Sequence, residues 1–286
     1  MLGGGHGFLQ GLHGYPADQI LEARVVLADG RWVTASPKSN SDLFWALRGA
    51  GHNFGIITSL KYKVYDAAPG WSVVMMTFSQ DKLEEIFDLA NDFIDPDDNP
   101  AELSVWYDFA RRPDLDSSSV SLYFTFSQTA GLIDSKATIG IRFIYQGELS
   151  DLEPFVSPFR SIGPLVEDVH GNVPYPDVFD ITSLAEDSES RVCDKGIYRN
   201  TSPVYTLRHN ATSMRRVHSI FDDLTTRYPD VASFSAFVSE RYPTQGVMSV
   251  PSDSTAAPHR KYQLLMLVSP ASKQTPPQPM STNTSF

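Results

Sequence analysis

The sequence predicts an α+β protein in which antiparallel sheets pack against helices. Two observations support this fold class. Apolar and polar residues alternate in several stretches, as at Leu60, Tyr62 and Val64, and such alternation is typical of half-buried strands. Other stretches, above all residues 210–227, place apolar residues three and four apart, which is typical of amphipathic helices. With 286 residues, 41% of them hydrophobic, the chain can bury one large core or two modest ones.

A hairpin and a helix are the first expected elements. Residues 20–27 and 32–35 are predicted strands, because Asp29-Gly30 between two β-rich runs is a strong hairpin signal. Ser41 or Asp42 is expected to cap a helix that ends at the glycines of residues 49–51. A further strand is predicted over residues 53–67, and the Ala-Ala-Pro-Gly sequence at 67–70 suggests a boundary.

Beyond this boundary the pattern resumes with longer strands and helices. Pro154 and Pro158 should break the helical stretch 149–162 into pieces. Residues 269–286 are rich in Pro, Ser, Thr and Gln, and a disordered tail is expected there. The predicted organisation is therefore a first domain over 1–69, a second over 70–268 and a tail over 269–286. The other predicted strands cover 72–78, 103–110, 119–127, 139–145, 232–238 and 262–268, and the other helices 81–94 and 210–227.

Composition argues against several classes of partner. The net charge is 23 − 34 = −11, which disfavours nucleic acid and anionic membrane surfaces as partners. No run of 18 apolar residues is present, so no membrane-spanning helix is predicted. Cys193 is the only cysteine, which excludes an internal disulfide and a cysteine-based zinc site. His6 and His13 have no further metal ligand near them in sequence, so no metal site is predicted.

Two glycine-rich groups are the main functional signal. Six of the first fifteen residues are glycine, which suits a tight backbone path or a backbone lying close to a ligand, although a flexible end is the alternative. They do not form the dinucleotide fingerprint, because Gly5 and Gly7 would require a glycine where Gln10 stands. The second group, residues 48–58, follows a helix. Side by side, the two groups could offer amide N–H groups to an anionic ligand.

Five sequence features then point to a family. GGGHG, the following Asp18, LEARVVLADG, DLFWALRGAG and NFGIIT stand in this order over residues 3–65. This region resembles the second half of the flavin-binding domain of berberine bridge enzyme-like oxidases, in the vanillyl-alcohol oxidase / p-cresol methylhydroxylase (PCMH) superfamily, and is most similar to fungal members. A weaker resemblance continues to about residue 268. The implied fold is the C-terminal part of a PCMH-type FAD-binding domain, followed by an antiparallel-sheet-plus-helices substrate domain.

The resemblance also implies a chemistry. Such proteins are FAD-dependent oxidoreductases, in which a substrate C–H gives hydride to the flavin and dioxygen reoxidises it. The implied substrate is a small molecule: a sugar, an alcohol or a secondary-metabolite intermediate. The residues implied to contact FAD are Gly3, Gly4, Gly5, His6, Gly7, Gly55, Ile56 and Ile57. Ile56 and Ile57 could instead be strand core, and His6 a hydrogen-bonded loop residue.

The catalytic base is left open by the sequence. Tyr107, Tyr123, Glu240 and Tyr242 lie on or at the ends of predicted strands. The alternation of side chains along a strand does not show which of these residues faces the flavin. A tyrosine in a strand is more often a packing residue. No catalytic residue is therefore assigned.

The sequence departs from the family pattern at both ends. Family members carry an earlier subdomain with a pyrophosphate loop, a histidine and a cysteine that can bond to flavin, and a closing segment that often offers a catalytic tyrosine. Cys193 does not stand at the position of that cysteine. We therefore expect a truncated chain that alone binds FAD poorly, since each charge-assisted hydrogen bond contributes roughly 1.5–3 kcal/mol.

Two other functional classes fit the sequence less well. The main alternative is a non-catalytic remnant or binding module that does not retain FAD. A hydrolase is disfavoured because the sequence has no G-x-S-x-G motif. The cellular compartment is left open.

Overall fold

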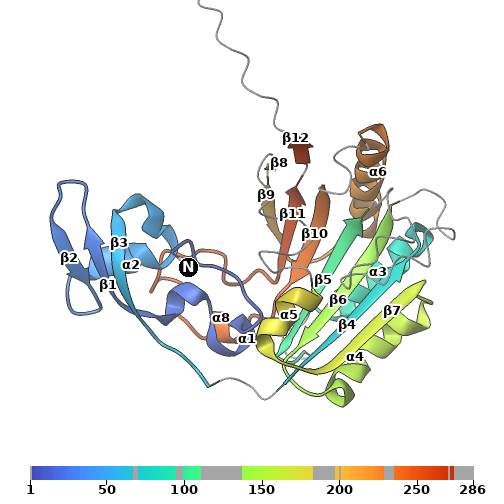
Figure 1. Cartoon of the computed structure of the whole chain (residues 1–286), viewed down its shortest axis with the longest axis horizontal. Coiled ribbons are helices and arrows are strands. Elements are labelled where there is room, and N and C mark those ends of the chain that lie inside the picture. The colour runs from blue at the N-terminus through green and yellow to red at the C-terminus, as the bar shows by residue number, and fades with distance from the viewer. Residues whose placement is uncertain are drawn as a thin grey trace, which may run out of the picture.

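The chain forms two parts with the glycine-rich segment between them (Figure 1). The computed structural model describes residues 2–66, 70–94, 99–110, 137–182, 197–199, 201–228, 235–269 and 271–273. We call residues 20–62 the small-sheet part and residues 70–269 the large-sheet part. The expected domain boundary at residue 69 lies outside the described residues.

The small-sheet part is an antiparallel sheet with one helix on it. Its described strands have the order β2-β1-β3 and are β1 (Ile20–Val26), β2 (Trp32–Ala35) and β3 (Ile56–Tyr62). Helix α2 (Ser41–Ala50) packs Phe44 and Leu47 against the sheet. The helix leaves helical geometry at Arg48 and Gly49, where Gly49 has a φ of 149°, and the 3₁₀ turn η2 (Gly51–Asn53) follows. The predicted hairpin and the predicted end of the helix at the glycines of residues 49–51 are confirmed.

The large-sheet part is built on one long antiparallel sheet. Across the described residues it has seven strands, ordered β7-β4-β6-β5-β10-β11-β9. Most predicted strands are confirmed within a few residues, whereas β7 and β9 were not predicted and the predicted strand 119–127 lies outside the described residues. The strands are β4 (Trp71–Phe78), β5 (Leu103–Ala110), β6 (Thr138–Tyr145), β7 (Val166–Val173), β9 (Ser202–Thr206), β10 (Ala236–Arg241) and β11 (Leu264–Ser269).

One face of this sheet, which we call the helix-covered face, holds the largest core. It packs against α3 (Leu83–Asp92), which follows η3 (Gln80–Lys82), and against α4 (Leu149–Ser161) and α6 (Ala211–Arg227). Asn210 caps α6 by accepting a hydrogen bond from the Ser213 N–H at 2.8 Å.

Helix α4 differs from its prediction. It is continuous over 13 residues through Pro154 and Pro158, where pieces were expected. A proline inside a helix costs roughly 3 kcal/mol. The inner side of α4 offsets this cost by burying Leu152, Val156 and Phe159, each with no exposed surface.

The opposite face, which we call the junction face, looks toward the glycine-rich segment. Trp71 and Trp106 line it together with Tyr242, and Phe8 from the glycine-rich segment is buried among them. The segment is thus anchored on the large sheet. The short elements on this side are α1 (Gln10–His13), η1 (Pro16–Gln19), α5 (Tyr175–Ile181) and α8 (Gln245–Met248).

The start of the expected tail over 269–286 forms strand structure instead. Ser269 still belongs to β11, and β12 (Ala271–Lys273) pairs with β8 (Ile197–Arg199). Backbone hydrogen bonding to β8 gives these residues a fixed place, although their composition is polar. Residues 274–286 lie outside the described residues.

Candidate functional site

The two glycine-rich groups lie side by side, as expected. The backbone oxygen of Leu2 accepts hydrogen bonds from the N–H groups of Gly49 and Gly51, both at 3.1 Å. The oxygen of Gly4 accepts from the Ala17 N–H at 3.0 Å, which ties the first turn to η1. The start of the chain therefore bridges the end of α2 and the beginning of η1.

A third segment, the loop of residues 250–260, packs against both glycine turns. The Trp45 indole N–H donates to the backbone oxygen of Asp253 at 2.7 Å, and the Ala256 N–H donates to the backbone oxygen of Trp45 at 3.3 Å. A Cβ added to Gly49 would lie 2.3 Å from the backbone of Ala256, so only glycine allows this approach. The loop is thus held against the end of α2.

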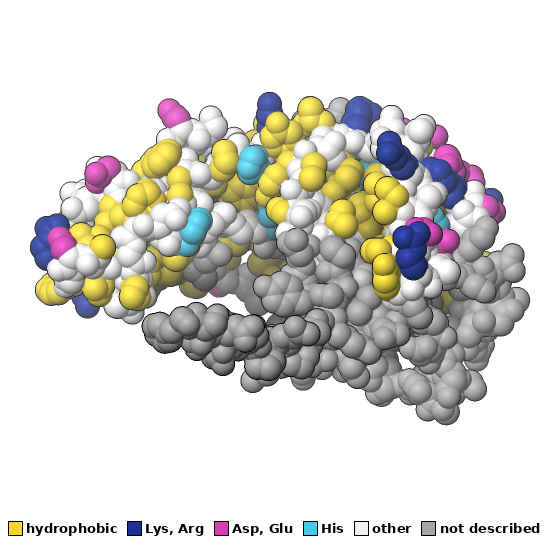
Figure 2. Space-filling model, turned by 90° about the horizontal axis from the view of Figure 1, so that it is seen from above, with side chains coloured by type: hydrophobic (Ala, Val, Ile, Leu, Met, Phe, Trp, Pro, Cys, Tyr) yellow, Lys and Arg dark blue, Asp and Glu magenta, His cyan; other side chains and the backbone are white. Residues whose placement is uncertain are grey.

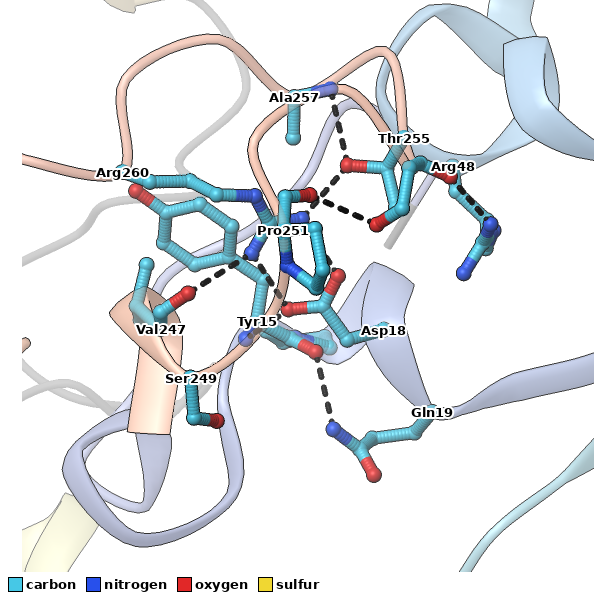
Figure 3. A network of polar contacts seen from close by, with 12 residues as sticks. Tyr15, Asp18, Gln19, Arg48, Val247, Ser249, Pro251, Thr255, Ala257 and Arg260 are labelled. Atoms are coloured by element: carbon cyan, nitrogen blue, oxygen red, sulfur yellow. Dashed lines mark hydrogen bonds and ion pairs between the residues drawn. The ribbon is translucent and has the colours of Figure 1, made fainter. Parts of the chain in front are cut away.

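A buried ion pair joins this loop to the N-terminal segment (Figure 3). Arg260 donates to both carboxylate oxygens of Asp18, at 2.6 and 2.9 Å, and also to the Thr255 hydroxyl and the Val247 oxygen. The two charged side chains are only 5% and 4% exposed. Asp18 also accepts from the Tyr15 N–H at 2.8 Å. Such a bidentate pair holds two segments in a defined geometry.

His6 stands where the glycine turn meets the large sheet. Its Nδ1 lies 2.8 Å from Oε1 of Gln10, and its Nε2 lies 3.0 Å from the Tyr205 hydroxyl. The imidazole stacks on the Tyr242 ring, with centroids 5.1 Å apart and 17° between the planes. Burial lowers the pKa of His6, so the side chain is neutral at physiological pH.

Glu240 and Tyr242 form a second polar pair beside His6. The Tyr242 hydroxyl donates to Glu240 at 2.9 Å. Burial raises the pKa of Glu240 to about 7, and burial together with this carboxyl raises the pKa of Tyr242 well above its ordinary value. A buried carboxyl that titrates near neutrality is typical of functional sites.

Strand register brings Tyr205 and Glu240 to the same face. Glu240 on β10 pairs with Leu265 on β11, which pairs with Tyr205 on β9. Directly paired residues point to the same side of a sheet, so both side chains face the glycine turn. Figure 2 shows hydrophobic and histidine side chains gathered where the two parts of the molecule meet.

The structure separates the candidates for the base. Glu240 and Tyr242 lie on the junction face beside His6, whereas Tyr107 is buried in the helix-covered core. Tyr123 lies outside the described residues. Tyr205 was missed because β9 was not predicted. The β-rich run Pro203–Thr206 before the Asn210 cap is the signal that could have revealed this strand.

Among the glycines predicted to touch FAD, four belong to the first turn. Gly4 and Gly5 have φ values of 98° and 88°, which require glycine for backbone reasons. Gly3 and Gly7 do not have a positive φ. A Cβ added to either residue would meet no atom within 4 Å, so no close contact requires glycine there. The packing of this chain therefore does not explain Gly3 and Gly7, and open space lies beside both.

The other predicted contacts lie at the start of β3. A Cβ on Gly55 would lie 2.4 Å from the Val26 oxygen, so pairing with β1 already accounts for this glycine. Ile57 packs into the small core, whereas Ile56 is 72% exposed. Of these residues, only Ile56 has a side chain free to meet a ligand.

In the parts of the chain that the structure describes, no group of three or more metal-binding side chains is arranged around a possible ion. No helix among the same residues combines the length and apolar character that crossing a bilayer requires.

Comparison with known proteins identifies relatives over most of the chain. No family model matches the sequence. The FAD-linked oxidoreductase anuG of Penicillium roqueforti is 36% identical over 266 residues, covering 93% of this chain and 48% of the relative. The FAD-linked oxidoreductase iacH of Pestalotiopsis fici is 34% identical over 270 residues, covering 93% and 47%. This chain thus spans about half the length of the curated relatives it matches.

Solved structures share the fold. The BBE-like 1 protein of Physcomitrella patens superposes with a TM-score of 0.69 at 20% identity, covering 96% of this chain and 54% of that protein. The xylooligosaccharide oxidase from Myceliophthora thermophila C1 gives a TM-score of 0.67 at 21% identity, covering 98% and 55%. The predicted fold class is confirmed.

Proposed function

This chain is a homologue of the fungal FAD-linked oxidoreductases, and we propose that it is an FAD-dependent oxidoreductase whose reaction site surrounds His6. When bound, FAD would accept a hydride from a substrate C–H bond and pass the electrons to dioxygen. The observation that carries this proposal is the glycine turn, where Gly3 and Gly7 leave open space that the protein's own packing does not use.

The two parts of the molecule have different tasks in this proposal. Residues 1–69 supply the rear of the FAD-binding domain, with the backbone of Gly3–Gly7 lying along the cofactor. Residues 70–268 supply the substrate domain, whose junction face presents Tyr205, Glu240 and Tyr242. The Asp18–Arg260 pair holds the two in register, because it joins η1 to the loop before β11.

The substrate that best fits this site is a small molecule bearing a hydroxyl group. His6 is neutral at physiological pH, so this side chain offers no charge to a charged substrate. Aromatic rings and hydroxyls around His6 suit an alcohol, a sugar or a hydroxylated secondary-metabolite intermediate. One structural neighbour is named as an oxidase of xylooligosaccharides, which supports the hydroxyl-bearing class.

Flavin retention tests the proposal. We would purify the full chain alone and together with a separately expressed segment, the one that precedes the matched region in the Penicillium roqueforti relative. The chain alone should bind added FAD weakly, and the mixture should bind it stoichiometrically and produce hydrogen peroxide with an alcohol or sugar panel. The readouts are flavin absorbance, fluorescence titration and peroxide.

The alternative function gives a different result. A non-catalytic binding module would melt cooperatively at a temperature unaffected by FAD, with or without the added segment. That outcome, with both polypeptides folded, would overturn the proposed function.

A further inference from the structure

The orientation of one buried amide determines which nitrogen of His6 carries the proton. The Gln10 side chain is 2% exposed, and its Nε2 donates to the backbone oxygen of Pro243 at 3.2 Å. A backbone oxygen can only accept, so the amide nitrogen must face Pro243 and Oε1 must face His6. This assignment does not depend on the histidine.

The tautomer of His6 follows from that orientation. Oε1 of Gln10 lies 2.8 Å from Nδ1 of His6 and cannot donate, so Nδ1 carries the hydrogen. In the neutral imidazole, Nε2 then holds a free lone pair. The Tyr205 hydroxyl, 3.0 Å away, donates its proton to this lone pair. His6 is therefore oriented as a base toward Tyr205.

Tyr205 lies between His6 and the more exposed side of the site. Its side chain is half-buried on β9, and its ring stacks on the exposed His259 with centroids 4.3 Å apart. A ligand on the junction face can thus meet the Tyr205 hydroxyl, whereas both ring nitrogens of His6 are already hydrogen-bonded.

Burial lowers the pKa of His6, and neighbouring groups partly offset this effect. The Tyr242 ring covers one face of the imidazole, and the Tyr15 ring meets it edge-on at 5.2 Å. The face of an aromatic ring attracts a cation. Tyr242 also connects this face to Glu240, whose carboxyl can lose its proton near neutral pH. His259 is a further titratable group in reach, and its charge would oppose protonation.

We propose that Tyr205 and His6 form the proton-accepting pair of this site, in which Tyr205 takes the proton of a substrate hydroxyl while it passes its own proton to Nε2 of His6. This inference rests on the proposed function. The substrate O–H and the Tyr205 O–H break, while a new Tyr205 O–H and a His6 N–H form. A bound flavin would take the hydride of the adjacent C–H bond, with its two electrons, so that an alcohol becomes a carbonyl and His6 becomes imidazolium.

The tautomer can be measured without flavin or substrate. Nitrogen-15 NMR of the full chain labelled at histidine, with the His6 signals assigned by their loss in His6→Gln, should show a protonated Nδ1 and an unprotonated Nε2. Tyr205→Phe should shift the Nε2 signal, because its hydrogen-bond donor is lost. Tyr262→Phe, a matched change in a neighbouring ring, should leave it in place. A His6 protonated on Nε2 at neutral pH would overturn the proposal.

Kinetics on flavin-loaded protein test the catalytic role. Tyr205→Phe and His6→Gln should each slow flavin reduction by substrate about 100-fold or more, with the flavin retained, since proton transfer by a positioned group contributes roughly 10²–10⁴-fold. His13→Gln, in the same segment but stacked on Tyr65, should leave the rate unchanged. Full rates in both site variants would overturn the pair while the proposed function stands. A protein that never binds flavin would overturn the function, and the NMR result would still decide the tautomer.

Discussion

Two neighbouring residues of strand β10, one acidic and one basic, lie on opposite faces of the large sheet. Glu240 lies on the junction face, where it accepts a hydrogen bond from Tyr242, and its pKa is raised to about 7. Arg241 lies on the helix-covered face, where one terminal nitrogen donates to the Leu103 oxygen at 2.8 Å and burial lowers its pKa to about 10. Glu240 can thus change charge near neutral pH, whereas Arg241 stays charged there.

Two buried arginines in the described part of the chain sharpen this contrast. Arg260, beside the junction face, is 4% exposed and binds both oxygens of Asp18. Arg241 is 2% exposed, and in the described part of the chain its Nε and second terminal nitrogen have no hydrogen-bond partner. The same residue type is therefore a paired charge in one region and an incompletely compensated charge in the other. Opposite effects are expected when each is replaced by methionine.

Arg260→Met should have the largest effect. It leaves the Asp18 carboxylate buried without its cation, which typically lowers the free energy of unfolding by about 3–5 kcal/mol. Denaturant unfolding measures the loss. In a double-mutant cycle with Asp18→Asn, the double variant should lose clearly less than the sum of the two single losses. Additive losses would show that the pair is not coupled.

Glu240→Gln should change the pH dependence of stability. Since the pKa of Glu240 is raised from 4.5 to about 7, its contribution to stability is full below pH 4.5 and is lost as the pH rises through 7. The variant should match the wild type at pH 4 and exceed it by on the order of 3 kcal/mol at pH 8.

His209 also makes stability depend on pH, and it must be separated from Glu240 in that experiment. Burial lowers its pKa from 6.5 to about 4, so its contribution makes stability rise with pH over this window, opposite in sign to that of Glu240. Both proteins carry His209, so its effect cancels in the difference. A difference between variant and wild type that is flat from pH 4 to 8 would contradict the assignment of Glu240 as a neutral buried carboxyl.

Arg241→Met should stabilise the protein. It removes a desolvated charge at the cost of one hydrogen bond to the Leu103 oxygen, and we expect a gain of about 1–3 kcal/mol in the free energy of unfolding. Chemical denaturation at neutral pH, side by side with Arg260→Met, makes the comparison direct. If Arg241→Met lowers the free energy of unfolding as much as Arg260→Met does, the predicted difference between the two buried arginines is wrong.

Gly7→Ala should have the smallest effect on stability and a clear effect on ligand binding. An added Cβ meets no atom within 4 Å, so the melting temperature should stay within error of the wild type. If a flavin lies along this backbone, affinity for FAD should fall at least tenfold, or about 1.4 kcal/mol. Gly11→Ala is the contrasting control: its Cβ would lie 2.0 Å from the Ala101 oxygen, so it should destabilise the fold itself.

Local signals in the sequence predicted much of the small-sheet part and the first half of the site. Asp29-Gly30 marked the hairpin, Gly49 the end of α2, and the glycine-rich segment placed His6 in the site. The polar partners of His6 were only partly predictable. Glu240 and Tyr242 could be named as candidates but not assigned to a face, and Tyr205 was missed because the five-residue strand β9 has a weak pattern.

Long-range pairing accounts for what the sequence could not reveal. Asp18 and Arg260 are 242 positions apart, and no local pattern indicates that they meet. Pro154 and Pro158 indicated a broken helix, yet burial of the inner side of α4 keeps it continuous. In both cases the deciding free energy comes from partners that are distant in sequence.

The amino-acid sequence by itself determined the α+β class, most strand and helix positions and the glycine turn beside His6, because these depend on backbone conformation and on residues a few positions apart. Only the tertiary structure decided which charges are paired, which face of β10 meets the glycine turn, and that the Tyr205 hydroxyl lies within hydrogen-bond distance of His6. These depend on the register of the large sheet, and a shift of one residue in β9 or β10 would turn Tyr205 or Glu240 to the other face of the sheet.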